Sequence, residues 1–179
     1  MARRPHVSVV GYNEDSCTEA AREAAYRVGT AVAREGGVVV CGGLGGVMEA
    51  ACRGARDAGG LSVGIVPSTE STQANGYCDV VVATGVGKSR NFMVAYTGDA
   101  LVVVGGGAGT LIEMAVAYQE SKPIVAVRGT GGVADQWAGR HLDDRRTVKV
   151  LEGATPEEAV RAALRAASPR KGRARPSRG

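Results

Sequence analysis

Aromatic side chains are scarce in this chain of 179 residues, which has one Trp, one Phe and five Tyr. A core with so few rings must consist of Val, Ala, Leu and Ile. Together with 27 glycines, that composition suits a buried parallel sheet with closely packed helices. No run approaches the roughly 20 apolar residues that a membrane span requires. We therefore expect a soluble, cytoplasmic protein that makes no contact with a membrane.

Cysteine and histidine are also few. The four cysteines are widely spaced and form no CxxC pair: Cys17, Cys41, Cys52 and Cys78. Without a secretory signal they are interpreted as reduced thiols, with Cys41 and Cys52 in the core. Only His6 and His141 could complete a zinc site, so we expect no metal and no cofactor.

Positive charge is concentrated at the end of the chain. The net charge is +4, but residues 165–179 carry six basic side chains and no acid, which leaves residues 1–164 at −2. The sequence predicts one domain over residues 1–164 and a basic, disordered tail over residues 165–179. Nucleic-acid binding through that tail is a weaker alternative, because the domain itself is not basic.

Strand-like and helix-like segments alternate along the domain. Strands are predicted at residues 6–11, 38–41, 61–66, 79–84, 100–104, 123–127 and 146–151. Helices are predicted at residues 16–35, 47–58, 88–97, 110–120 and 155–167. Because the strands are uniformly apolar, we predict a single-domain, Rossmann-like α/β fold with a doubly wound parallel sheet of about seven strands. Residues 129–145 are assigned no role.

Two glycine-rich turns follow predicted strands, CGGLGGVME at residues 41–49 and GGGAGTLIE at residues 105–113. Ligands of open α/β sheets bind at the carboxyl ends of strands, and a helix that begins there offers N–H groups to an anion. The predicted phosphate-binding residues are Gly42, Gly43, Gly45, Gly46, Gly106, Gly107, Gly109 and Thr110. The expected ligand is small, phosphorylated and nucleotide-like; tight strand-to-helix packing without a ligand is the alternative.

These turns do not match the best-known nucleotide motifs. Met48 and Thr110 occupy the third glycine position of GxGxxG, and no acid follows the strand at residues 38–41 to bind a ribose. The pattern GxxxxGK[ST] is absent from the sequence. A P-loop NTPase is therefore excluded, and a dinucleotide site is disfavoured.

Two longer segments resemble a known family. GGLGGVMEAACRGARDAGGLSVGIVP (42–67) and SRNFMVAYTGDALVVVGGGAGTLIE (89–113) are similar to the two signature regions of the Lonely Guy superfamily, which includes cytokinin-activating phosphoribohydrolases. The family motif PGGxGTxxE is matched from Gly106 to Glu113, and Arg90 stands nine residues before Asp99, as the family's arginine does. The resemblance implies that Arg90 and Glu113 are the catalytic pair.

Three departures from the family point to one branch of the superfamily. Gly105 stands in place of the motif's proline, Asn91 stands in place of the lysine that follows the arginine, and few aromatic side chains are available to stack a base. These features resemble the branch that includes the molybdenum cofactor carrier protein of algae. The resemblance implies either a phosphoribohydrolase, which releases base and ribose 5-phosphate from a nucleoside 5′-monophosphate, or a non-catalytic carrier or sensor of a phosphorylated ligand such as the molybdenum cofactor. It also implies a homo-oligomer, a dimer or higher.

Glu113 has two interpretations. As a catalyst it would stabilise the positive charge that develops on ribose when the N-glycosidic bond breaks, while Arg90 holds the phosphate or the leaving base. Alternatively, Thr110 and Glu113 have the spacing of a capping box, the pattern that Thr155 and Glu158 repeat. The spacing alone favours a capping role for Glu113, whereas its register with Arg90 favours a catalytic role.

Overall fold

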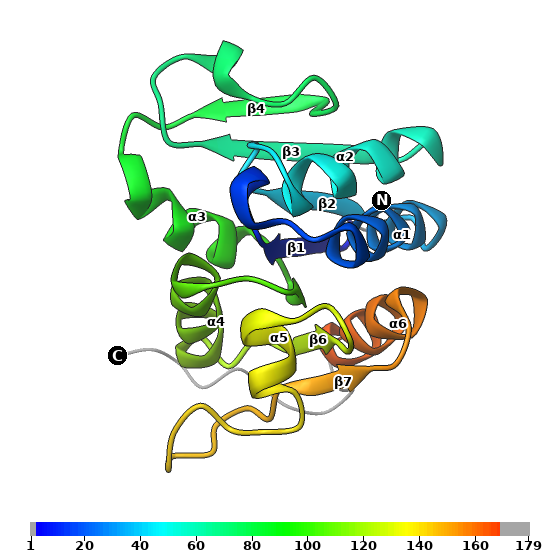
Figure 1. Cartoon of the computed structure of the whole chain (residues 1–179), viewed down its shortest axis with the longest axis vertical. Coiled ribbons are helices and arrows are strands. Elements are labelled where there is room, and N and C mark those ends of the chain that lie inside the picture. The colour runs from blue at the N-terminus through cyan, green and yellow to red at the C-terminus, as the bar shows by residue number, and fades with distance from the viewer. Residues whose placement is uncertain (1–2, 169–179) are drawn as a thin grey trace.

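The fold is described for residues 3–168 by a computed structural model, which confirms the predicted α/β architecture. Over that range the strands form one sheet of seven in the order β4-β3-β2-β1-β5-β6-β7, and every pairing is parallel (Figure 1). The strands are β1 (His6–Gly11), β2 (Val38–Cys41), β3 (Leu61–Val66), β4 (Val80–Ala83), β5 (Ala100–Val104), β6 (Ile124–Val127) and β7 (Leu151–Gly153).

Helices cover both faces of the sheet. They are α1 (Glu19–Arg34), α2 (Val47–Asp57), α3 (Arg90–Thr97), α4 (Ala108–Gln119), α5 (Gly132–Trp137) and α6 (Pro156–Ala167). One apolar cluster joins α1, α2 and α6 to the sheet, and a second joins α3, α4 and α5 to its other face. The sheet is therefore doubly wound, and its central strands are apolar without alternation because both of their faces are covered.

Helices α1 and α2 pack with their backbones in contact. A Cβ atom at Gly29 would lie 2.0 Å from the carbonyl oxygen of Ala51, and one at Gly54 would lie 2.0 Å from that of Tyr26. No side chain fits between the helices at these two points. The abundance of Gly and Ala in both helices follows from this close approach.

Two parts of the predicted element order need correction. The strand predicted at residues 146–151 is wrong except for its last residue, because β7 is Leu151–Gly153 and pairs with β6. Arg146 has a positive φ of 52°, and Lys149 forms only an isolated antiparallel bridge to His141, so this segment is not a parallel strand. The helix α5 was missed; it is short and begins after Gly131, at a φ of 80°.

The predicted end of the domain, residue 164, lies within α6, which continues to Ala167 and so includes the first three residues of the predicted basic tail. Residues 169–179, which make up most of that tail, lie outside the described residues. Between residues 3 and 168, no helix is both long and apolar enough to cross a membrane.

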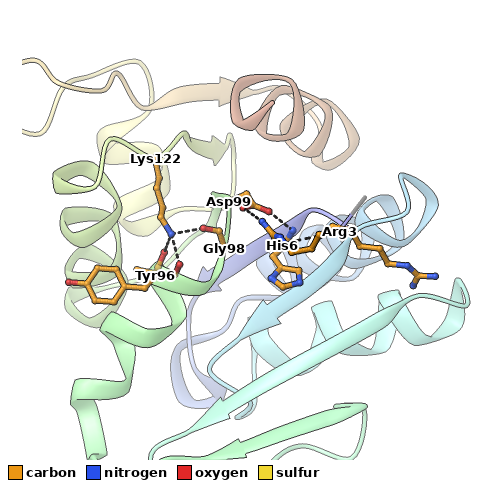
Figure 2. Close-up of polar contacts among 8 residues, drawn as sticks. Arg3, His6, Tyr96, Gly98, Asp99 and Lys122 are labelled. Atoms are coloured by element: carbon orange, nitrogen blue, oxygen red, sulfur yellow. Dashed lines mark hydrogen bonds and ion pairs between the residues drawn. The ribbon is translucent and has the colours of Figure 1, made fainter. Parts of the chain in front are cut away.

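Lysine 122 caps the end of α3. Its Nζ, in the turn between α4 and β6, donates hydrogen bonds to the carbonyl oxygens of Ala95 (2.9 Å), Tyr96 (2.5 Å) and Gly98 (2.6 Å), as Figure 2 shows for the last two. The last carbonyl groups of a helix have no partners within the helix and carry partial negative charge. The ammonium group therefore satisfies the end of α3 and ties it to the start of β6.

Aspartate 99, at the entrance to β5, ties the same region to β1. One carboxylate oxygen accepts a hydrogen bond from the backbone N–H of His6 (2.8 Å), and the other pairs with Arg3 (2.6 Å; Figure 2). Together with Lys122, this contact fixes α3 at its far end. Arg90 is the first residue of α3, at the opposite end of the helix. The contacts that hold the last turn of α3 therefore also help to fix the position of Arg90.

We expect Lys122→Met to destabilise the protein by about 2 kcal/mol, since it removes a charged donor from three carbonyl groups and keeps the aliphatic chain. Denaturant unfolding followed by circular dichroism measures the change. Arg161→Met, at an exposed position of α6, is the matched control. Equal stability of the two variants would contradict a capping role for Lys122.

Candidate functional site

A cavity of about 630 Å³ lies at the carboxyl edge of the sheet. Its wall includes the end of β1 at Gly11, Gly42 after β2, the start of α3 at Arg90, and the start of α4 from Gly107 to Thr110. The strand order changes direction between β1 and β5, and open α/β sheets bind ligands in the crevice at that point. The cavity is therefore where this fold places a ligand.

The start of α4 is open toward this cavity. Gly107 is the N-cap residue and makes no side-chain cap, and Ala108, Gly109 and Thr110 line the cavity. The first N–H groups of a helix have no partner within it and carry partial positive charge, which makes them an anion site. This arrangement has the chemistry to bind a phosphate.

The capping-box interpretation of Glu113 is wrong. Helix α4 begins two residues before Thr110, whose hydroxyl donates to the carbonyl oxygen of Gly11 (3.1 Å) instead of capping its own helix. At α6 the same spacing does form a cap, where Thr155 Oγ1 accepts a hydrogen bond from the N–H of Glu158 (3.2 Å). The carboxylate of Glu113 therefore does not cap the start of α4.

Glu113 instead faces Arg90. Arg90 Nη1 lies 3.4 Å from Glu113 Oε1 and 2.7 Å from Asn91 Oδ1, and Arg90 and Glu113 are 9% and 5% exposed. Within the described residues, the Nε of Arg90 has no hydrogen-bond partner. The structure therefore brings together the two residues that the sequence pairs, 23 positions apart, in a buried site.

Burial raises the pKa of Glu113 to about 7, although the positive charge of Arg90 acts in the opposite direction. Near neutral pH this carboxyl group therefore exists in both protonation states. A group of this kind can donate or accept a proton, or contribute a negative charge, according to what binds beside it.

Half of the predicted phosphate-binding residues line the cavity: Gly42, Gly107, Gly109 and Thr110. The others lie outside its lining: Gly43, Gly45, Gly46 and Gly106. Gly42 is in contact with the arginine, since a Cβ atom there would lie 2.5 Å from Arg90 Nη2. A glycine at this position leaves room for the guanidinium group.

The first glycine turn already holds a carboxylate. The N–H of Gly46, the N-cap residue of α2, donates to Glu14 Oε2 (2.7 Å), and Glu14 also pairs with Arg22 (2.9 Å). The hydrogen bonds from Arg22 and Gly46 lower the pKa of Glu14, so it is an anion at neutral pH. The start of α2 thus has an anion from within the chain, whereas the start of α4 has none from the described residues.

Gly105 differs structurally from the proline of the Lonely Guy motif. Its φ is +61°, and its N–H donates to Thr130 Oγ1 (2.8 Å). Proline has neither this φ nor an N–H group, so it could not occupy the position. A Cβ atom would also lie 2.2 Å from the ring of Tyr12, which packs over the glycine and lines the cavity.

Sequence reasoning missed several residues of the cavity wall. Tyr12 and Asn13 follow β1 directly, at the same edge of the sheet as the glycine turns. That turn has no glycine motif, so only its place after a strand could have marked it. Lys88, two residues before Arg90, brings a further positive charge to the wall.

Known proteins are similar to this chain in sequence and in fold. A model of the SLOG cluster4 family matches residues 4–160. An uncharacterized protein of Archaeoglobus fulgidus is 42% identical over 122 residues, which cover 68% of this chain and 79% of that protein.

Two solved structures are similar over nearly the whole chain. The molybdenum cofactor binding protein of Rippkaea orientalis has a TM-score of 0.81 at 30% identity, over 92% of this chain and 98% of that one. The molybdenum cofactor carrier protein of Chlamydomonas reinhardtii has a TM-score of 0.78 at 29% identity, with the same two coverages of 92% and 98%. The chain therefore belongs to the SLOG cluster4 family of the Lonely Guy-like superfamily.

Proposed function

We propose that this protein is a non-catalytic carrier or sensor of a small phosphorylated ligand, and that the ligand is a phosphorylated pterin of the molybdenum cofactor type. The observation that carries the proposal is the open start of α4 at a cavity of about 630 Å³. The two relatives named for binding or carrying the molybdenum cofactor share this fold over 92% of the chain, which supports the choice of ligand.

The ligand's phosphate binds the N–H groups of Ala108, Gly109 and Thr110, where the dipole of α4 favours an anion. Lys88 adds a positive charge on the same wall and increases the rate at which an anion enters. The rest of the ligand occupies the cavity between Tyr12 and the Arg90–Glu113 pair. Polar atoms of a pterin ring suit the guanidinium and the carboxyl group, since these offer donors and an acceptor in a buried place.

Gly107→Val should weaken binding at least tenfold while the protein stays folded. Gly107 has an extended backbone, and a Cβ atom there meets nothing within 4 Å, so a side chain is accommodated but projects at the phosphate site. Calorimetry and thermal shift with the molybdenum cofactor, released from a donor enzyme, should give at least tenfold weaker binding than for the wild type.

The matched control is Gly76→Val, another glycine whose Cβ would meet nothing within 4 Å, at a site outside the cavity lining. This variant should bind as the wild type does. A dephosphorylated pterin should bind weakly to all three proteins. Equal binding of the cofactor by the wild type and Gly107→Val would contradict the assignment of the phosphate to α4.

A second candidate function, nucleoside 5′-monophosphate phosphoribohydrolase, is favoured by one observation, the buried contact of Arg90 with Glu113. In this reaction the Glu113 carboxylate stabilises the oxocarbenium character of ribose, and water attacks the anomeric carbon as the base leaves. Arg90 holds the leaving base or the phosphate.

If this reaction occurs, AMP and related monophosphates should release free base, and the rate should rise with pH through about 7 as the fraction of ionised Glu113 rises. Glu113→Gln should abolish release yet retain ligand binding, because it keeps the size of the side chain. Chromatography of the free base measures both proteins. No release above background from a broad panel of monophosphates would exclude the hydrolase and leave the carrier.

The expected homo-oligomer remains a prediction, and exposed apolar side chains on α3 support it. Phe92, Met93 and Tyr96 are 45%, 39% and 52% exposed on that helix. Light scattering should give a mass above that of one chain, and Tyr96→Glu should reduce it. Leu151→Glu, at an exposed apolar position of the edge strand β7, is the control and should leave the mass unchanged.

A further inference from the structure

Three cysteines that are far apart in the sequence lie close together next to the first glycine turn, at residues 41–49. Cys41 ends β2, Cys52 lies within α2, and Cys78 precedes β4. The Sγ atoms of Cys41 and Cys52 are 3.4 Å apart, those of Cys52 and Cys78 are 3.7 Å apart, and all three lie within 4.8 Å of one another. None of the three is in a disulfide. Three thiols that converge in this way form a set of donor atoms.

The spacing of the sulfurs fits a metal ion. Bonds of about 2.3 Å to one ion would hold three sulfurs about 3.8–4.0 Å apart, in tetrahedral or trigonal geometry. The separations of 3.4 and 3.7 Å lie just below these values, and the third does not exceed 4.8 Å, so small side-chain rotations would bring the three thiols to one ion. Cys41 and Cys52 are fully buried and Cys78 is half-buried, so an ion would enter from the side of Cys78.

The surroundings supply hydrogen bonds to the sulfurs. The N–H of Gly43 donates to Cys41 Sγ (3.3 Å). Hydrogen bonds from Cys41, Cys52 and Asn75 lower the pKa of Cys78. Hydrogen bonds of this kind orient the sulfurs that hold a metal and stabilise them.

Burial and the neighbouring sulfurs act on the other two thiols. Hydrogen bonds with Cys52 and Cys78, and burial, raise the pKa of Cys41. At Cys52 the bond with Cys41 lowers the pKa, but the bond with Cys78 and burial raise it to about 12. A metal ion that binds would displace the thiol protons to solvent as the sulfur–metal bonds form.

We propose that Cys41, Cys52 and Cys78 bind one Cu(I) ion. Among the His, Cys, Asp and Glu side chains of residues 3–168, three cysteine sulfurs make up this group, and thiolate ligands select ions such as Cu(I) and zinc. Zinc takes four ligands in structural sites, whereas the described residues supply three, with no histidine or carboxylate among them. The thioether-bearing side chain of Met48 packs in the same small apolar cluster, which keeps water from the ion.

The test is an anaerobic titration of the whole protein with Cu(I) in the presence of a chelator that competes for it. The wild type should retain one Cu(I) per chain and show the ultraviolet charge-transfer absorption of copper thiolates. Cys78→Ser should bind at least tenfold more weakly. Cys17→Ser is the matched control, because Cys17 is also free but lies outside the cluster, and it should retain one ion.

X-ray absorption of the loaded wild type provides a measurement that does not depend on the folding of a variant. It should detect sulfur neighbours alone, three of them, at about 2.3 Å. Loss of copper to the chelator from the wild type, equal retention by Cys78→Ser, or retention of zinc but not of Cu(I) would each overturn the proposal.

Discussion

A buried arginine connects the parts of this protein that form its cavity. Arg90 begins α3, and its guanidinium group donates hydrogen bonds to Glu113 of α4 and to Asn91. The same group packs against Gly42, which follows β2. A buried charge is costly unless it is paired, so these neighbours are constrained as a set. Gly42 is explained by the space that the guanidinium group needs. A glycine at position 42, which lines the cavity, is therefore required by the arginine, and contact with a phosphate is not needed to account for it.

Most strands and most helices could be predicted because they depend on local patterns. Uniformly apolar runs mark strands that are covered on both faces, and Thr155 followed by Pro156 marks the start of α6. The partnership of Arg90 with Glu113 came from the family resemblance, not from spacing, which favoured a capping box. The start of α4 at Ala108 decides against that box, and helix boundaries are what sequence patterns predict least well.

Contacts between distant segments could not be predicted. The carboxylate of Glu14 satisfies Gly46, 32 residues away, and removes the start of α2 from the set of open anion sites. The cysteines were interpreted as separate thiols because no two of them form a CxxC pair. Their convergence depends on α2 returning alongside β2 and on the loop before β4, and neither is visible in the spacing. Tertiary contact, not local propensity, decides these features.

The charge on Glu113 bears on which of the two proposed functions fits the cavity better. A phosphate bound at the start of α4 places negative charge on the wall that Glu113 shares, and a nearby like charge raises the pKa of a carboxyl group further. Since the pKa of Glu113 is already about 7, an anionic ligand favours its protonated form. A neutral carboxyl group donates a hydrogen bond to a ligand, whereas stabilising an oxocarbenium ion requires the carboxylate. A protonated Glu113 therefore supports the proposed carrier, which holds an anionic ligand, more than the hydrolase.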